Sequence, residues 1–422
     1  MWRDLTVNVT DLLFSVSEAM DLADPSLTDH QLRTAFVAWQ MARHAGMDPI
    51  EQDKLFVASM LHDIGALSPE EKMGIHAFEE MLPEPHCMRG EKLFEEAFWL
   101  APSAPLVRWH HTAMRAHRAA GRTLQTPDVL ASQILFLADH LERAINRKQF
   151  ILHQHHDLIR RMQALAPNSL HPDVIGLFDA ISGTEDFWLD LVSGSLGKML
   201  MRRSPLRTVD LDFATARALA GVFKDMTDFR SRFTATHSSG VAACCVGLAA
   251  ALSFTGKDGQ QIELAGMLHD IGKLVVPNAI LCKAGKLTAH EYAVIRQHPH
   301  HTHRILSRIN GLQQVAEWAG LHHERLDGSG YCGAMNCNEL DLGAKVVAVA
   351  DVATAMAEKR PYRDPCTQDL VLGTLDDMAR ARLLDQQVVA ALGDNYAAIM
   401  GAAAEAQGAD QRRFSSRYAA VG

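Results

Sequence analysis

The sequence predicts an almost entirely α-helical chain that contains two copies of one helical domain. Most apolar residues recur at intervals of three and four, the spacing of one helix face, in stretches such as 31–45, 261–268 and 291–305. The alternating pattern of strands is scarce, and we expect at most one small hairpin near 327–342. A long-range repeat of histidine and aspartate positions then divides the helical chain into two similar halves.

The repeat consists of two ordered sets of residues. The C-terminal set is His237, His269, Asp270, His298, His322, His323 and Asp351, and the N-terminal set is His30, His62, Asp63, His86, His110, His111 and Asp139. In both halves the first histidine precedes the His-Asp pair by 32 residues, the His-His pair follows the third histidine by 24, and the last aspartate comes 29 later. The step from the His-Asp pair to the third histidine differs, at 29 residues in the C-terminal half and 24 in the N-terminal half. Chance does not explain such an ordered match, so we infer a duplicated domain.

The length of 422 residues also indicates more than one domain. We predict an N-terminal domain at 1–195, a C-terminal domain at 205–400 and a C-terminal tail at 401–422. The Gly- and Ser-containing stretch 193–205 is the best linker candidate, although Gly and Ser punctuate a turn between two helices equally well.

The overall composition narrows the function classes. A net charge of −9 argues against binding of DNA or RNA polymers, which require a basic surface. Acidic residues Asp4 and Asp11 interrupt any signal peptide, and no run of about 20 apolar residues would span a membrane. The seven cysteines form no CxxC pair, so no disulfide framework is indicated. We therefore expect a cytoplasmic protein with no membrane partner.

The residue types in the repeat favour metal chemistry. Imidazole and carboxylate together suit iron, manganese or zinc, whereas calcium prefers oxygen ligands alone. Adjacent His and Asp side chains can reach two neighbouring metal ions, with the carboxylate as a bridge. Two such ions a few Å apart hold a bridging hydroxide as nucleophile and neutralise the charge of a phosphodiester.

Two motifs in the C-terminal half carry a specific resemblance. HDIGK at 269–273 and HHERLDGSGYC at 322–332 resemble the HD-GYP family of bacterial phosphodiesterases, an all-α subset of the HD superfamily that cleaves cyclic dinucleotides, chiefly cyclic di-GMP. The resemblance covers 210–392. It implies metal-dependent hydrolysis of a cyclic dinucleotide, cyclic di-GMP or 3′,3′-cyclic GMP-AMP (cGAMP), to a linear 5′-phosphorylated dinucleotide.

The same resemblance implies roles for individual residues. The C-terminal set would bind two divalent metal ions, with iron or manganese expected. Lys273 and Asp270 would be catalytic, since a lysine beside the scissile phosphate stabilises negative charge or protonates the leaving oxygen. Tyr331 would line the nucleotide pocket, and Arg360 and Arg363 would grip a phosphate or a guanine edge. The stretch 274–291 resembles the segment that covers the site in this family.

The C-terminal half departs from the family pattern at two positions. Cys332 replaces the proline of the GYP motif, which stiffens a turn without touching metal, so activity should survive. Family members with three metal ions carry a glutamate where this chain has Phe233, which cannot ligate a metal. We therefore expect a site for two metal ions.

The N-terminal half resembles a plain HD domain. It keeps all seven ligand types but has Ala66 in place of the lysine and lacks the GYP segment. Three hypotheses stay open for it: a metal-dependent second hydrolysis, for example of a phosphomonoester; a regulatory or dimerising module; and a redox or small-ligand sensor that controls the C-terminal enzyme.

For the whole chain, the alternatives are a cyclic-dinucleotide receptor that does not cleave, and an HD enzyme of other chemistry, such as a nucleotide phosphomonoesterase or a diiron oxygenase. Self-association of helical HD modules makes a homodimer an expectation. Other cyclic-dinucleotide signalling proteins are expected partners.

Overall fold

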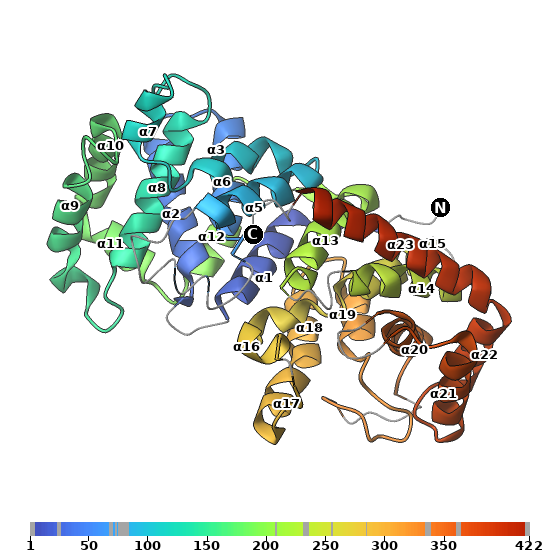
Figure 1. The fold of residues 1–422 in the computed structure, drawn as a ribbon. Helices are drawn as coiled ribbons and strands as arrows, with labels where there is room; N and C mark the ends of the chain where they lie inside the picture. The colour runs from blue at the N-terminus through green and yellow to red at the C-terminus, as the bar shows by residue number, and fades with distance from the viewer. Residues whose placement is uncertain are drawn as a thin grey trace. The chain divides into compact units, whose positions relative to one another are not determined.

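The structure of the protein is a computed structural model that describes residues 5–22, 27–66, 71, 74, 84–206, 209–230, 236–254, 256–283, 285–333, 339–359 and 364–417. The chain forms two compact units, the N-terminal unit Val9–Val209 and the C-terminal unit Met1–Asn8 with Asp210–Gly422. Both units are built from helices (Figure 1), so the all-α prediction is confirmed.

The described secondary-structure elements of the N-terminal unit are all helices. Its α-helices are α1 (Val9–Asp21), α2 (His30–His44), α3 (Pro49–Leu61), α5 (Glu84–Glu96), α6 (Ala104–Trp109), α7 (Met114–Ala119), α8 (Val129–Ala144), α9 (His155–Gln163), α10 (Pro172–Ser182), α11 (Glu185–Leu191) and α12 (Leu196–Arg203), with 3-10 helices η2 (Ala101–Ser103) and η3 (Ile151–His153). The helix α12 occupies most of the stretch that the sequence marks as a linker.

The C-terminal unit adds one short pair of strands to its helices. Its elements are β1 (Val7–Asn8), β2 (Asp210–Leu211), α13 (Phe213–Asp228), α14 (His237–Ala251), α15 (Gly256–Leu268), η4 (Ile271–Val275), α16 (Asn278–Leu281), α17 (Ala289–Arg296), α18 (His298–Leu306), α19 (Gln313–Gly320), α20 (Leu342–Ala357), α21 (Gln368–Arg380), α22 (Gln386–Asp394) and α23 (Tyr396–Arg417). The antiparallel β1–β2 pair joins the beginning of the chain to the segment that enters α13, with Val7 opposite Leu211.

Helix starts in the C-terminal unit follow from local capping. Asp212 accepts a hydrogen bond from Thr215 N at 2.9 Å before α13, and Asp341 accepts one from Ala344 N at 3.2 Å before α20. Such side chains satisfy backbone donors that a helix start leaves without a partner. Asp341 also accepts a hydrogen bond from Trp318 Nε1 at 2.7 Å, so the cap of α20 is tied to α19 as well.

The helix α14 is the central element of the C-terminal unit. Its residues are apolar or small almost all round, and it packs against α15, α20 and α23. In Figure 1, α23 lies along α14, so residues 401–417 continue a packed helix. A helix that is apolar on every side is the expected sequence of a buried element.

One local expectation differs from the structure, and another falls partly outside the described residues. The predicted helix 291–305 is divided at Gln297 into α17 and α18, because Pro299 has no backbone N–H and favours a new helix start. Within the expected hairpin, Asp327 is a β-bridge residue, the other described residues of 327–333 and 339–341 form turns, bends and irregular backbone, and 334–338 lie outside the described residues. None of the described helices combines the length and the apolar character that a membrane crossing requires.

Candidate active site

Six of the seven residues of the C-terminal set lie at helix ends, and the seventh lies inside a helix; all of them meet in the core of this unit. His237 begins α14, the His269–Asp270 pair follows α15, and His298 begins α18. The His322–His323 pair directly follows α19, and Asp351 lies within α20. Residues separated by more than 100 positions in the sequence are therefore brought into one buried cluster.

Asp270 lies between two of these histidines. Its Oδ1 is 3.2 Å from His298 Nε2 and its Oδ2 is 3.3 Å from His269 Nε2. Two further groups surround it: the ligand atoms of His237, His269 and Asp351 lie within 4.8 Å of one another, as do those of His298, His322 and His323. Asp270 thus stands where a carboxylate could bridge two metal positions.

The orientation of the imidazoles fits metal binding. Nδ1 of His269, His298 and His322 each lies near the backbone carbonyl three residues earlier, at 2.9, 2.8 and 2.6 Å. With Nδ1 as the donor, Nε2 carries the lone pair and faces the cluster. His269 Nε2 is buried and, although Asp270 Oδ2 lies 3.3 Å away, makes no well-aligned hydrogen bond among the described residues; His298 Nε2 faces His322 Nε2 at 3.3 Å. Buried nitrogen lone pairs that converge in this way require a cation, so the residues fit divalent metal ions.

Charges in the cluster are strongly coupled. Burial would raise the pKa of Asp270, but Lys273 and His269 hold it well below its usual range. Burial would lower the pKa of His237, but Glu358 and Asp351 raise it to about 10. Lys273 Nζ lies 2.5 Å from Asp270 Oδ2, and this carboxylate outweighs burial and raises the pKa of Lys273. The lysine is therefore protonated at neutral pH.

Residues expected to contact substrate are only partly described. The Tyr331 ring stacks on the ring of His323, with centroids 4.8 Å apart and planes inclined by 29°. Burial raises the pKa of Tyr331, so its phenol is neutral at physiological pH. Arg360, Arg363 and Phe233 lie outside the described residues. The segment 274–291 contains the end of η4, then α16 and the start of α17.

The N-terminal set forms a closely similar cluster within its own unit. His30 Nε2 faces His62 Nε2 at 3.2 Å, and His86 Nε2 faces His110 Nε2 at 3.2 Å. Asp63 lies between them, with Oδ2 3.5 Å from His62 Nε2 and Oδ1 3.8 Å from His86 Nε2. His111 and Asp139 complete the set, with Nδ1 and Oδ2 3.7 Å apart.

A glycine explains why the cluster forms in the same way twice. A Cβ at Gly272 would lie 2.0 Å from the carbonyl oxygen of His298, and a Cβ at Gly65 would lie 2.0 Å from that of His86. Any larger residue would push the third histidine away from the His-Asp pair. The glycine of the HDIG motif is thus part of the geometry that assembles each cluster.

The two clusters differ in how exposed their side chains are and in the basic residue that lies beside the carboxylates. Asp351 is 15% exposed and Lys273 is 21% exposed in the C-terminal unit. In the N-terminal unit Asp139 is only 2% exposed, and Arg143 Nη1 contacts its Oδ2 at 3.2 Å. The C-terminal cluster is therefore the more open one.

Sequence reasoning missed the carboxylates that orient the first histidine of each set. Glu358 Oε2 lies 3.2 Å from His237 Nδ1, and Glu142 Oε2 lies 2.5 Å from His30 Nδ1. Glu358 comes seven residues after the last aspartate of its set, whereas Glu142 comes three residues after. It also missed His140, which groups with His111 and Asp139. The single feature of the sequence that could have revealed these two carboxylates is that each is an acidic residue a few positions after the last aspartate of its set.

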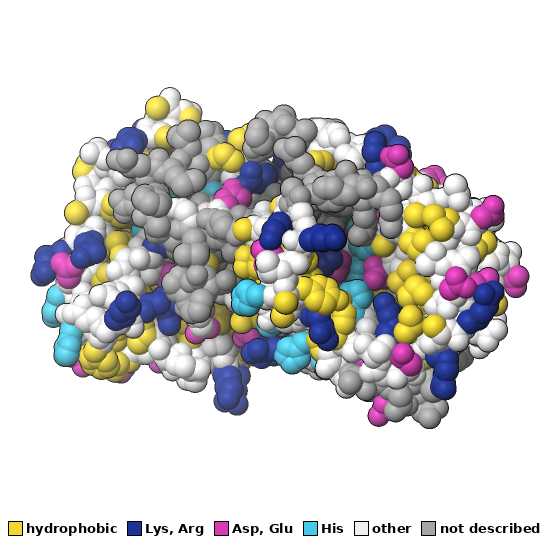
Figure 2. All heavy atoms as spheres, turned by 60° about the horizontal axis from the view of Figure 1, so that its bottom comes forward, with side chains coloured by type: hydrophobic (Ala, Val, Ile, Leu, Met, Phe, Trp, Pro, Cys, Tyr) yellow, Lys and Arg dark blue, Asp and Glu magenta, His cyan; other side chains and the backbone are white. Residues whose placement is uncertain are grey.

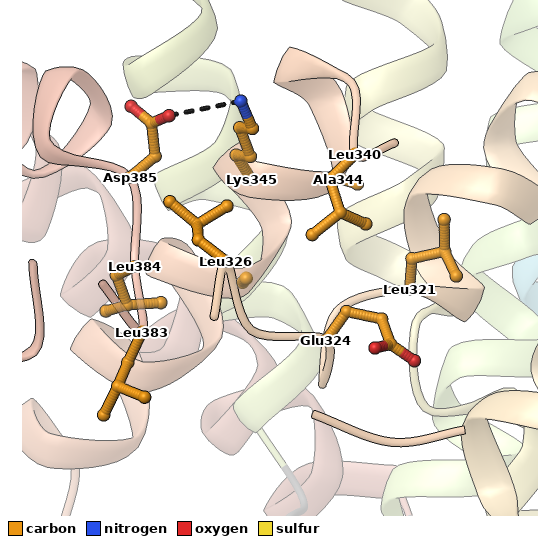
Figure 3. Close-up of a pocket in the computed structure, with 10 residues that line it drawn as sticks. Leu321, Glu324, Leu326, Leu340, Ala344, Lys345, Leu383, Leu384 and Asp385 are labelled. Atoms are coloured by element: carbon orange, nitrogen blue, oxygen red, sulfur yellow. Dashed lines mark ion pairs between the residues drawn. The ribbon is translucent and has the colours of Figure 1, made fainter. Parts of the chain in front are cut away.

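A separate pocket is lined in part by Leu321 and Glu324, the residues that flank the His322–His323 pair along the chain (Figure 3). Leucines dominate its lining, together with Glu324 and the Lys345–Asp385 ion pair, whose Nζ and Oδ2 atoms are 3.3 Å apart. Glu324 Oε1 accepts a hydrogen bond from Gly333 N at 2.5 Å and so stabilises the turn that carries Tyr331. The lining of this pocket contains no histidine, so we assign it to packing.

The described part of the face drawn in Figure 2 is mixed in charge. On the face drawn in Figure 2, Lys and Arg side chains are interspersed with Asp and Glu, and several histidines are visible among them. The described part of that face shows no continuous basic band of the kind that binds polymeric nucleic acid.

Comparison with known proteins identifies both halves. Two family models, each described as HD domain, match residues 221–388 and residues 27–144. The chain is 27% identical over 393 residues to 3′3′-cGAMP-specific phosphodiesterase 1 of Vibrio cholerae, which covers 90% of each chain. It is 29% identical over 322 residues to 3′3′-cGAMP-specific phosphodiesterase 3 of the same organism, covering 75% of this chain and 67% of that relative.

A solved structure supports the same fold. The crystal structure of a cyclic GMP-AMP specific phosphodiesterase of Vibrio cholerae, V-cGAP3, aligns with a TM-score of 0.61 and 21% identity, covering 93% of this chain and 98% of that one. The tandem histidine clusters, the helical units and the matched models agree. The chain therefore belongs to the HD superfamily and carries two HD domains.

Proposed function

We propose that the C-terminal domain is a metal-dependent phosphodiesterase that hydrolyses a cyclic dinucleotide to a linear 5′-phosphorylated dinucleotide. The observation that carries this proposal is the open cluster in which Asp270 lies between His269 and His298 while Lys273 contacts its second oxygen. Two relatives that match this chain over 90% and 75% of its length are named as cGAMP-specific phosphodiesterases, which favours 3′,3′-cGAMP over cyclic di-GMP as the first substrate to test. A receptor that does not cleave and a phosphomonoesterase are not favoured.

The residues of the C-terminal set would hold the metal. HD domains are metal-dependent hydrolases, and the clusters of this chain can bind metal. We propose two ions, iron or manganese, held by His237, His269, Asp270, His298, His322, His323 and Asp351. When bound, such ions supply positive charge for the phosphate oxygens and lower the pKa of water.

The side chains around the cluster would position and activate the substrate. The Lys273 ammonium would stabilise charge on the scissile phosphate and donate a proton to the leaving ribose oxygen. Asp270 keeps this lysine protonated and holds it at the edge of the cluster. Tyr331 would line the nucleotide pocket, and we propose Arg360 and Arg363 as further contacts to phosphate or base.

The N-terminal domain is proposed to bind metal without performing the same reaction. Its converging imidazoles support metal binding, whereas the loss of the lysine at Ala66 and the burial of Asp139 argue against cleavage of a bulky diester. A regulatory role and a second phosphohydrolase activity both fit this arrangement. Cytoplasmic location, a homodimer and contacts with other cyclic-dinucleotide signalling proteins stay predictions.

The double variant His269→Ala, Asp270→Ala tests the proposal. It removes a ligand of each metal position in the C-terminal domain while leaving the N-terminal domain unchanged. We expect no linear dinucleotide from metal-loaded variant protein. The matched control is His62→Ala, Asp63→Ala, which should still cleave the substrate. Turnover that survives in the first variant but not in the control variant would move the activity to the N-terminal domain.

A further inference from the structure

Arg296 is a cation that contacts Tyr331, the aromatic residue that stacks on His323 of the candidate metal site. It is the last residue of α17, and its guanidinium carbon lies 4.7 Å from the centroid of the Tyr331 ring. The Tyr331 ring also stacks on His323. A second aromatic ring, that of Tyr292, lies 5.9 Å from the same guanidinium. A direct series of contacts therefore runs from a proposed metal ligand to an arginine on a neighbouring helix.

Both ends of α17 are fastened, so the position of Arg296 is well defined. The helix starts with a reciprocal capping box between Thr288 and Glu291, and Lys283 adds an ion pair to Glu291 at 2.6 Å. At its other end, the Sγ of Cys332 donates to the carbonyl oxygen of Arg296 at 3.2 Å. This last contact joins α17 to the residue that follows Tyr331.

The Arg296 guanidinium contacts aromatic rings but no carboxylate among the described residues. The side chain is exposed, and among the described residues it forms no ion pair with a carboxylate. Stacking on a ring holds a guanidinium by its face and leaves the N–H groups of its edge directed outward. Arg296 thus presents several donors in one plane beside the site.

We propose that Arg296 is a specificity-determining residue that reads the O6 and N7 acceptors of a guanine base in the substrate. A guanidinium edge matches these two acceptors bidentately, whereas adenine presents an amino donor where guanine has O6. The exposed Tyr292 ring beside Arg296 suits a nucleobase better than a phosphate, because every base has a face that stacks on such a ring. This inference rests on the proposed function, since the scissile phosphate must lie at the cluster near Lys273.

The test measures two proteins, with and without the Arg296 side chain, against two ligands, with and without the N7 acceptor. The ligands are 3′,3′-cGAMP and its 7-deazaguanine analogue, which lacks the N7 acceptor. Dissociation constants are measured in metal-loaded Lys273→Ala protein, so that binding is observed without turnover. We expect Arg296→Ala to weaken binding of 3′,3′-cGAMP about 10- to 100-fold and to remove the difference between the two ligands. Arg304→Ala, an exposed arginine on α18, is the matched control and should leave both constants unchanged.

Three results would overturn the assignment. Equal weakening of both ligands by Arg296→Ala, with the difference between them intact, would indicate a phosphate contact. Rescue by Arg296→Lys would indicate that charge alone matters. Unchanged constants would remove Arg296 from the site. Turnover of 3′,3′-cGAMP by the parent protein, measured in parallel, separates failure of this inference from failure of the proposed function.

Discussion

His298 Nε2 and His322 Nε2 face each other at 3.3 Å, while the Nδ1 of each ring is directed at a backbone carbonyl oxygen. Two lone pairs in this arrangement repel unless a cation lies beside them. The N-terminal unit repeats it with His86 and His110 at 3.2 Å. Metal should therefore be a large part of the stability of each unit.

We predict that removal of metal destabilises the protein and that manganese or iron restores it. Metal at about 100 times its dissociation constant stabilises a fold by about 2.7 kcal/mol. His322→Ala should lower the metal content of the C-terminal domain and reduce the shift of the thermal unfolding midpoint on metal addition. Metal analysis and calorimetry measure both. His300→Ala, an exposed histidine on the same helix as His298, should behave like the parent; equal losses in both variants would contradict the assignment.

The Glu358 carboxylate should orient His237 for metal binding. Its Oε2 lies 3.2 Å from His237 Nδ1, and it also accepts a hydrogen bond from Gln407 Nε2 at 3.1 Å. Loss of such a partner typically costs about 10- to 100-fold in metal affinity or activity. We predict a decrease of this size for Glu358→Gln, measured by metal titration and by kcat/KM. Glu405→Gln, on the exposed side of α23, is the control; a Glu358→Gln protein with unchanged affinity would exclude this role.

Lys273 should act on the chemical step more than on binding. Its ammonium lies 2.5 Å from Asp270 Oδ2, at the edge of the cluster. A positioned proton donor is worth about 100- to 10,000-fold in rate. We predict that Lys273→Ala lowers kcat by this factor with little change in KM and with normal metal content, whereas the exposed Lys257→Ala has no effect. A large rise in KM with kcat intact would instead indicate a binding role.

The stability of the metal-free N-terminal unit should depend on pH through Glu142 and His30. Burial raises the pKa of Glu142, but His30, Arg147 and Arg33 lower it to about 2, so its contribution is present above pH 4.5 and is lost as pH falls toward 2. Burial lowers the pKa of His30, but Glu142 and Asp63 raise it to about 10, so this contribution is present below pH 6.5 and is lost as pH rises toward 10.

The pair should therefore stabilise the metal-free unit most between pH 4.5 and 6.5. We predict that Glu142→Gln lowers the unfolding midpoint of metal-stripped protein most in that range and less at pH 3 and pH 8.5. Thermal unfolding followed by circular dichroism tests this. A constant difference between parent and variant across all three conditions would show that Glu142 acts through packing.

Much of the architecture was accessible from the sequence, because most cluster residues lie in short local motifs at helix ends. The repeat of HD and HH pairs could be recognised from the spacing of these residues alone. The structure brings all seven residues of each set together. The partners Glu358 and Glu142 were not accessible, since their distances from the last aspartate differ and depend on how α20 and α8 pack. The contact between Arg296 and Tyr331 likewise depends on tertiary structure, and the break before α18 was missed although Pro299 marks it.

The most direct test of the account is product analysis with purified protein loaded with manganese or iron. Cyclic di-GMP and 3′,3′-cGAMP would be offered in parallel and the products separated by chromatography. We predict a linear 5′-phosphorylated dinucleotide, with 3′,3′-cGAMP the faster substrate. Absence of any linear product from either substrate, with two metal ions bound per C-terminal domain, would contradict the account and favour a receptor that binds without cleavage.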